Sequence, residues 1–216
     1  LTNQIAIQDT ISGKCEYDAI RQIHALLNTP GTISIGYNTL GFDDEFLRFS
    51  FYRNLLSPYT HQYENGCHRV DLFPIAILFW LYRRESLKWP EIDHQVSLKL
   101  EHLSQANQLA QGPAHTAMVD VRASIELANR FCRHTEMWNY LLGYFRKELD
   151  TERIAKLPSI IDSELGSHQM ALLFSGEFGY KNSFQIPVIS LGRSNAYSNQ
   201  TLWLRLDMPQ LQETET

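Results

Sequence analysis

One histidine and two aspartates are the residues of this sequence whose types and order could do chemistry. His115 and Asp120 lie close together at the entrance to a helical run, and Asp43 lies upstream in the acidic cluster Phe42-Asp43-Asp44-Glu45. Carboxylates are ligands that Mg²⁺ prefers, and two-ion hydrolysis of a phosphodiester needs several of them. An imidazole titrates near neutral pH and suits the base that activates water. These residue types suggest metal-dependent phosphodiester hydrolysis, but a His-x4-Asp spacing often arises by chance, and on spacing alone a loop histidine that caps a helix is the better reading.

The spacing of His115 and Asp120 restricts where the histidine can lie. Five residues of a regular helix rotate by roughly 140°, so the two side chains diverge if both lie inside the helix. They converge only if His115 lies on the loop or the first turn that leads into the helix. Gln111-Gly112-Pro113 ends the preceding helix and favours that arrangement.

The elements that must position these residues alternate between helix and strand over the first part of the chain. A short β-branched strand at 32–37 leads to the acidic cluster, and Asp71 is placed to cap an apolar helix. Helical spacing of apolar residues predicts helices at 15–28, 43–56, 72–82, 98–109, 121–132 and 137–149. We therefore expect an α/β domain over residues 1–150.

The pattern changes after Lys156-Leu157-Pro158. Short β-like runs at 160–161, 170–174, 184–191 and 201–206 are separated by Gly, Asn and Ser. This spacing is typical of a small all-β module, which we place at residues 158–216, with a boundary near 150–158.

Composition excludes several classes of protein. The formal net charge of -5 argues against a broadly basic nucleic-acid binder, though not against a confined groove. The three cysteines are widely spaced and form no CxxC pair, so neither a disulfide framework nor a zinc site is indicated. No signal peptide opens the sequence, and the apolar run Leu72–Tyr82 is about half the roughly 20 residues of a membrane helix. We expect a cytoplasmic monomer with no membrane contact.

Several segments, in order, resemble bacterial exodeoxyribonuclease I, a family of the DEDD exonuclease superfamily with a histidine in its third motif and a ribonuclease H-like fold. They are Gly36-Tyr37-Asn38 with Phe42-Asp43-Asp44-Glu45, Phe51-Tyr52-Arg53-Asn54, Leu100-Glu101-His102-Leu103 with Ala106-Asn107, and Ala114-His115 with Asp120. Phe174-Ser175-Gly176-Glu177-Phe178-Gly179 is similar to the start of the family's SH3-like domain. The resemblance covers nearly the whole chain and implies an exonuclease domain followed by part of an SH3-like β domain.

The resemblance also implies roles for individual residues. Asp43 matches the second-motif aspartate, Asp120 the third-motif metal ligand and His115 the general base, around two Mg²⁺ ions, for which Mn²⁺ could substitute. Lys99 stands where the family has a substrate-binding arginine, which keeps the charge but loses the bidentate fork.

Three further residues match positions that line the path of single-stranded DNA: Arg48, Tyr59 and Tyr63. For the two tyrosines, loop packing is an equally good reading. Arg53 and Arg69 are assigned to the scaffold, and Asp44 and Glu45 to the acidic first turn of a helix.

The family's first motif, an Asp-x-Glu on the first strand of the sheet, is not found at the start of this sequence. The three Asp-x-Glu pairs present are Asp43/Glu45, Asp150/Glu152 and Asp162/Glu164, and none has the expected position. We therefore expect a fragment truncated at its N-terminus, marginally stable and inactive alone.

The expected activity of the parent protein is 3'-to-5' hydrolysis of single-stranded DNA to 5'-mononucleotides in DNA repair or recombination. Single-stranded DNA is the expected partner, and single-strand-binding protein is a second candidate partner. Three alternatives stay open: a non-catalytic single-strand-binding fragment, an RNA-trimming or proofreading exonuclease of the same superfamily, and an unrelated α/β domain.

Overall fold

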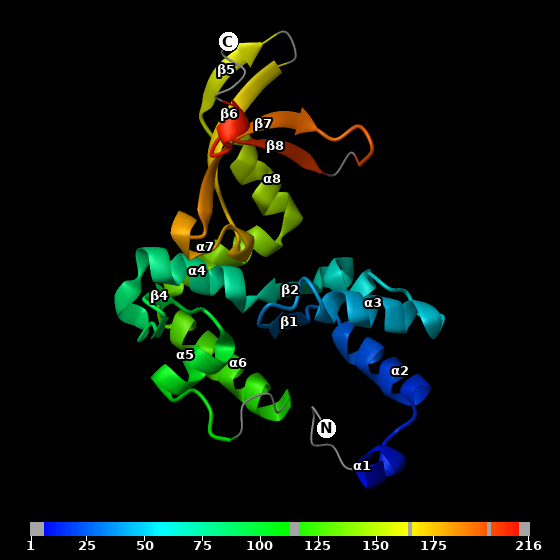
Figure 1. The fold of residues 1–216 in the computed structure, drawn as a ribbon. Coiled ribbons are helices and arrows are strands. Elements are labelled where there is room, and N and C mark those ends of the chain that lie inside the picture. Colours follow the sequence, from blue (N-terminus) through cyan, green and yellow to red (C-terminus); the bar gives the residue numbers. More distant parts are fainter. Residues whose placement is uncertain (1–6, 113–116, 164–165, 198–199, 212–216) are drawn as a thin grey trace. The chain divides into compact units, whose positions relative to one another are not determined.

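A computed structural model describes residues 7–112, 117–163, 166–197 and 200–211 (Figure 1). Its contacts divide the chain into two compact units, Leu1–Phe145 and Arg146–Thr216. The division falls slightly before the boundary that composition suggests. No described helix is long and apolar enough to cross a membrane.

The first unit combines one pair of parallel strands with several helices and a short hairpin. Its helices are α1 (Ile7–Ser12), α2 (Glu16–Leu27), α3 (Asp43–Arg53), α4 (Leu72–Tyr82), α5 (Leu100–Asn107), α6 (Ala117–Cys132) and α7 (Thr135–Leu142), with 3₁₀ turns η1 (Thr60–Gln62), η2 (Glu64–Gly66), η3 (Arg84–Ser86) and η4 (Gly143–Phe145). Its strands are β1 (Ile33–Gly36), β2 (His68–Asp71) and the short hairpin β3 (Glu91–Ile92) and β4 (Gln95–Val96). The unit is thus α/β, as predicted.

The parallel pair brings two strand ends to one place. In β1 and β2, Ile33 pairs with His68 and Gly36 pairs with Asp71. The alternation of β1 leaves Ile33 and Ile35 exposed, at 44% and 46% of their surface. Figure 1 shows the carboxyl end of each strand leading into a helix, β1 into α3 through a loop and β2 directly into α4.

The core of the first unit forms around α4. Most of its side chains are buried, which fits a helix that is apolar on all sides. Asp71 caps it by accepting a hydrogen bond from the Phe73 amide, as predicted. Helix α6 packs against α4, and the rings of Phe79 and Phe131 stack with centroids 4.2 Å apart. Each fully buried aromatic side chain of this kind stabilises the fold by about 1.5–3 kcal/mol.

The second unit is one helix and an antiparallel sheet. It contains α8 (Lys147–Ala155), β5 (Ser159–Ser163), β6 (Gly166–Phe174), β7 (Gln185–Arg193) and β8 (Thr201–Arg205), with 3₁₀ turns η5 (Gly176–Phe178) and η6 (Tyr180–Asn182). The strand order is β5-β6-β7-β8. Ile186 and Val188 are buried on one face of β7, and the register shifts at Gly192, whose φ of 95° favours glycine.

Several elements differ from those expected; α1 and the β3–β4 hairpin, for example, were not predicted. The single helix predicted at 137–149 is wrong: α7 ends at Leu142, a 3₁₀ turn follows from Gly143, and extended Arg146 precedes α8. Strand β2 was not predicted, because its four residues include a histidine, an arginine and an aspartate and show no alternation.

Candidate active site

The loop that leads to Asp43 is fixed by a buried carboxylate. Asp71 is 2% exposed and accepts hydrogen bonds from the Asn38 amide at 2.7 Å and the Leu40 amide at 3.3 Å, besides that of Phe73 at 2.9 Å. Asn38 has a φ of 56°, a left-handed conformation that asparagine tolerates. A single side chain at the end of β2 therefore holds the loop after β1 and the first turn of α4.

The acidic cluster begins α3, where the helix dipole favours negative charge. Asp43 is exposed, and among the described residues its carboxylate has no hydrogen bond or ion pair. Asp44 instead forms an ion pair with Arg69 on β2, and its side chain is largely buried. Burial raises the pKa of Asp44, and the nearby Arg69 only partly opposes that shift. Asp43 is the carboxylate of this pair that is open to a ligand.

A hydrogen bond joins the same loop to the segment that carries Lys99. The Tyr37 hydroxyl donates to the carbonyl oxygen of Leu98, and its ring lies 5.6 Å from that of Phe73. Burial, with a smaller contribution from Asp71, holds the pKa of Tyr37 far above its ordinary value, so the hydroxyl keeps its proton. Lys99 follows at the start of α5 with an exposed side chain.

Arg48 of α3 lies beside Tyr59, which precedes η1. The Arg48 guanidinium carbon is 5.6 Å from the centre of the Tyr59 ring. A guanidinium nitrogen of Arg48 also lies 2.8 Å from a carboxylate oxygen of Glu45. Tyr59 and Tyr63 are both exposed. The structure therefore brings Arg48 and Tyr59 together and leaves both tyrosine side chains exposed.

The third predicted element, α6, carries Asp120 in its first turn. The Asp120 side chain is half-buried, and its carbonyl oxygen accepts a hydrogen bond from Ser124 at 2.9 Å. His115 lies outside the described residues. The convergence of Asp43, Asp120 and His115 stays a prediction.

The described residues do not make a metal site by themselves. Asp43 and Asp120 offer the hard carboxylate oxygens that suit Mg²⁺. Among the residues with described positions, however, no group of three or more His, Cys, Asp or Glu side chains could hold a metal ion. Asp162, of the Asp-x-Glu pair in the second unit, lies in β5, and Glu164 is outside the described part of the chain. A two-ion site would need ligands beyond this set.

Sequence and fold both relate the chain to a known nuclease. It is 36% identical over 152 residues to exodeoxyribonuclease I of Escherichia coli (strain K12), a match that covers 69% of this chain and 30% of that protein. A solved structure of exonuclease I covers the whole chain with a TM-score of 0.85 and 28% identity. This chain is similar to part of bacterial exodeoxyribonuclease I. No family model matches it.

The similarity extends to a structure that holds nucleic acid. E. coli exonuclease I in complex with a dA16 oligonucleotide matches 94% of this chain at a TM-score of 0.80 and 29% identity. The chain spans less than half of these solved exonuclease I chains. It covers 42% of the chain in the dA16 complex and 45% of the chain in the structure with the TM-score of 0.85. Its fold is accordingly that of an α/β exonuclease domain followed by part of an SH3-like β domain, as predicted.

Two residues that organise the site were not assigned to it from sequence. Asp71 was predicted only as a helix cap, although it also binds the loop before Asp43. Tyr37 was quoted only as part of a motif. Its hydrogen bond to Leu98 joins residues that are 61 positions apart, and no local sequence pattern reveals such a contact.

Proposed function

We propose that this chain is part of a metal-dependent exonuclease that removes nucleotides from the 3' end of single-stranded DNA and releases 5'-mononucleotides. One observation carries the proposal: the matched solved structure of exonuclease I with a dA16 oligonucleotide shares the fold of almost the whole chain. The proposed setting is DNA repair or recombination in the cytoplasm.

The proposed roles follow the motifs. Asp43 and Asp120 are two carboxylate ligands within a larger set, and His115 takes a proton from the attacking water. The exposure of Asp43 and its lack of a partner among the described residues support a ligand role. The proposed cofactor is Mg²⁺, with Mn²⁺ as a substitute.

Lys99, Arg48, Tyr59 and Tyr63 are proposed to contact DNA. Lys99 offers a charge to a phosphate, and the tyrosines offer ring faces to bases. A solved ExoI/SSB-Ct complex matches 97% of this chain with a TM-score of 0.81 and 29% identity. It supports single-strand-binding protein as a partner of the complete protein.

A second candidate function is single-strand binding without cleavage. It is favoured by the lack of a three-ligand cluster among the described residues. The first unit would then supply a DNA path, and the complete protein would have lost the metal site.

A cleavage assay separates the two functions. Single-stranded oligonucleotides labelled at the 5' end or at the 3' end are incubated with this chain and with the complete gene product, in Mg²⁺ and in EDTA. The complete gene product should release labelled mononucleotide at once from the 3'-labelled strand only, and EDTA should stop it. Binding without any cleavage by the complete gene product would overturn the nuclease proposal in favour of the second candidate.

A further inference from the structure

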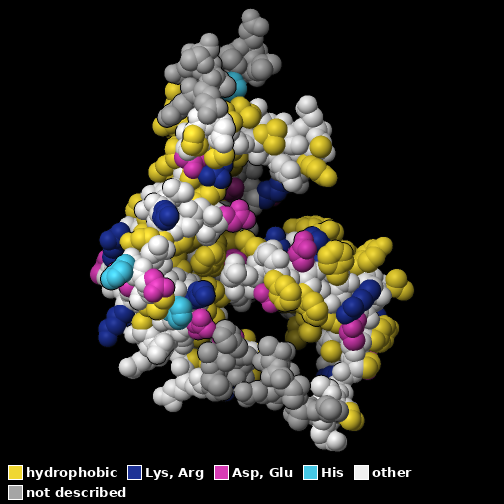
Figure 2. Space-filling model, viewed as in Figure 1, with side chains coloured by type: hydrophobic (Ala, Val, Ile, Leu, Met, Phe, Trp, Pro, Cys, Tyr) yellow, Lys and Arg dark blue, Asp and Glu magenta, His cyan; other side chains and the backbone are white. Residues whose placement is uncertain are grey.

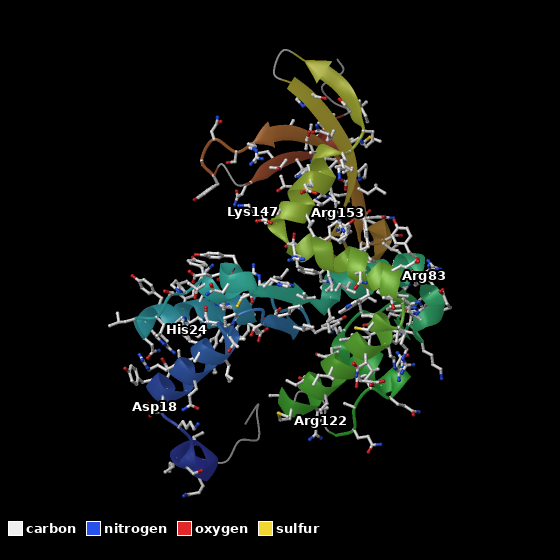
Figure 3. The ribbon with its side chains drawn as sticks, turned by 180° about the vertical axis from the view of Figure 1, so that it is seen from behind. Asp18, His24, Arg83, Arg122, Lys147 and Arg153 are labelled. Carbon is white, nitrogen blue, oxygen red and sulfur yellow. The ribbon has the colours of Figure 1, made fainter. Side chains whose placement is uncertain are left out.

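The outward face of α3 is aromatic. Phe42 just before the helix, Phe46 and Phe49 recur at a spacing that puts them on one side, and they are 71%, 55% and 59% exposed. The rings of Phe42 and Phe46 stack with their planes 17° apart and centroids 6.3 Å apart. The helix buries Phe51 instead, against His24 of α2 and His61 of η1; His24 is labelled in Figure 3. The three phenylalanines are therefore not core residues of the described unit.

The aromatic face of α3 continues through the Arg48 guanidinium to the ring of Tyr59. The Arg48 guanidinium carbon lies 5.1 Å from the centre of the Phe49 ring and 5.6 Å from that of Tyr59. We call the four rings and this arginine the aromatic track: Phe42, Phe46, Phe49, Arg48 and Tyr59. Figure 2 shows hydrophobic side chains gathered, with charged ones between them, over the part of the surface where Figure 1 draws α3.

We propose that the aromatic track is a base-stacking surface for single-stranded DNA, which extends the substrate contacts of Arg48 and Tyr59 onto Phe46 and Phe49. The inference rests on the proposed function. Exposed aromatic rings with an interleaved arginine are how proteins hold single strands through their bases. The track is also continuous with Arg48 and Tyr59, which are already candidate DNA contacts.

The charges beside the track indicate which part of the strand faces it. Asp43 stands at the start of the same helix with no ion pair among the described residues, and in the absence of a bound metal it repels phosphates. Arg48 is partly neutralised by its ion pair with Glu45. Bases therefore face the rings, and the sugar-phosphate chain lies on the side away from α3.

The test compares two oligonucleotides that differ only in their bases. The complete gene product, without divalent cations so that nothing is cut, is titrated into fluorescent oligo-dT and into an abasic strand of the same length. The double variant Phe46→Ala/Phe49→Ala should weaken oligo-dT binding by roughly 5-fold to 100-fold and leave abasic binding unchanged. The salt dependence should stay the same, because stacking releases no counterions. Phe49→Trp should keep the affinity for oligo-dT.

A matched control uses another ring under an arginine. Tyr17 on α2 is 53% exposed, and the Arg21 guanidinium carbon lies 5.2 Å from its ring centre. Tyr17→Ala should leave both affinities unchanged, and thermal melts should show that all variants are folded.

The outcomes separate the two proposals. If the wild-type protein prefers oligo-dT and the double variant keeps that preference, the aromatic track is overturned and the proposed function stands. If the double variant loses affinity equally for oligo-dT and for the abasic strand, the track is overturned as well, since the rings would then act through phosphate contact or through a distorted fold. If the wild-type protein binds neither strand, both proposals fail.

Discussion

The hydroxyl of Tyr37 donates a hydrogen bond to the main-chain carbonyl of Leu98 and so ties the loop before Asp43 to the residue before Lys99. One candidate metal ligand and one candidate phosphate contact thus depend on the same part-buried hydrogen bond. Asp71 also holds this loop, because its carboxylate accepts a hydrogen bond from the Asn38 amide. These two interactions explain how a short loop holds a position without regular secondary structure.

The first prediction concerns that bond. Tyr37→Phe keeps the ring against Phe73 but leaves the Leu98 carbonyl without its donor, so the free energy of unfolding should fall by roughly 1–3 kcal/mol. Urea denaturation followed by circular dichroism measures it. Tyr17→Phe, at an exposed ring, should change the midpoint by a few tenths of a kcal/mol at most. Equal effects of the two substitutions would show that the Tyr37 hydroxyl stabilises nothing.

The second prediction concerns Asp71. Asp71→Ala leaves three backbone amides without their acceptor, at about 1 kcal/mol or more for each, so we expect a loss of roughly 3 kcal/mol. Asp71→Asn keeps one acceptor oxygen and should lose less. Urea midpoints of both variants measure the difference. The control is Asp93→Asn at an exposed position whose φ of 52° asparagine tolerates. If Asp71→Ala is as stable as the wild-type protein, Asp71 does not support the loop.

Local patterns were sufficient for three features of the site but not for β2. The strand before Asn38, the acidic start of α3 and the Asp71 cap each depend on residues within a few positions, and each was predicted. The predicted helix at 137–149 was wrong because its apolar spacing persists through a break at Gly143 that only packing reveals.

Long-range contacts were beyond the sequence. The ion pair of Asp44 with Arg69 joins α3 to a strand that has no β pattern, so Arg69 could be assigned only to the scaffold in general. The partner of Tyr37 is equally remote. The exposed rings of Phe46 and Phe49 look like core positions in the sequence, because helical periodicity does not tell which apolar face has a neighbour.

The third prediction is a dependence of stability on pH. Burial, with smaller contributions from Arg69 and His24, lowers the pKa of His61 from 6.5 to about 4. Between these values only the unfolded chain binds the proton, so the stabilisation is complete above pH 6.5 and is lost as the pH falls toward 4. The loss should reach up to about 3 kcal/mol.

Urea unfolding at pH 7.5, 6, 5 and 4.5 measures this loss. His61→Phe keeps an aromatic ring beside Phe51 and should flatten the dependence over this range. His94→Asn, at an exposed histidine, should leave it unchanged. If His61→Phe keeps the full dependence, another group titrates.

The fourth prediction tests the proposed base in the complete gene product. His115→Ala should lower turnover by about 10²-fold to 10⁴-fold, the range for a general base, and leave the affinity for single-stranded DNA nearly intact. Rates are measured at saturating oligonucleotide, and affinities in EDTA. His94→Asn should retain wild-type turnover. A collapse of DNA binding together with the rate would mean that His115 holds the structure or the strand.

The fifth prediction concerns Lys99, whose exposed side chain is proposed to meet a phosphate. Lys99→Ala should weaken binding of single-stranded DNA by the complete gene product and reduce the slope of log affinity against log salt by about one phosphate contact. Lys99→Arg keeps the charge and should keep the slope. Lys14→Ala, at another exposed lysine, should change neither quantity. Because the slope counts the phosphates neutralised, an unchanged slope in Lys99→Ala would place this lysine outside the DNA path even if affinity fell.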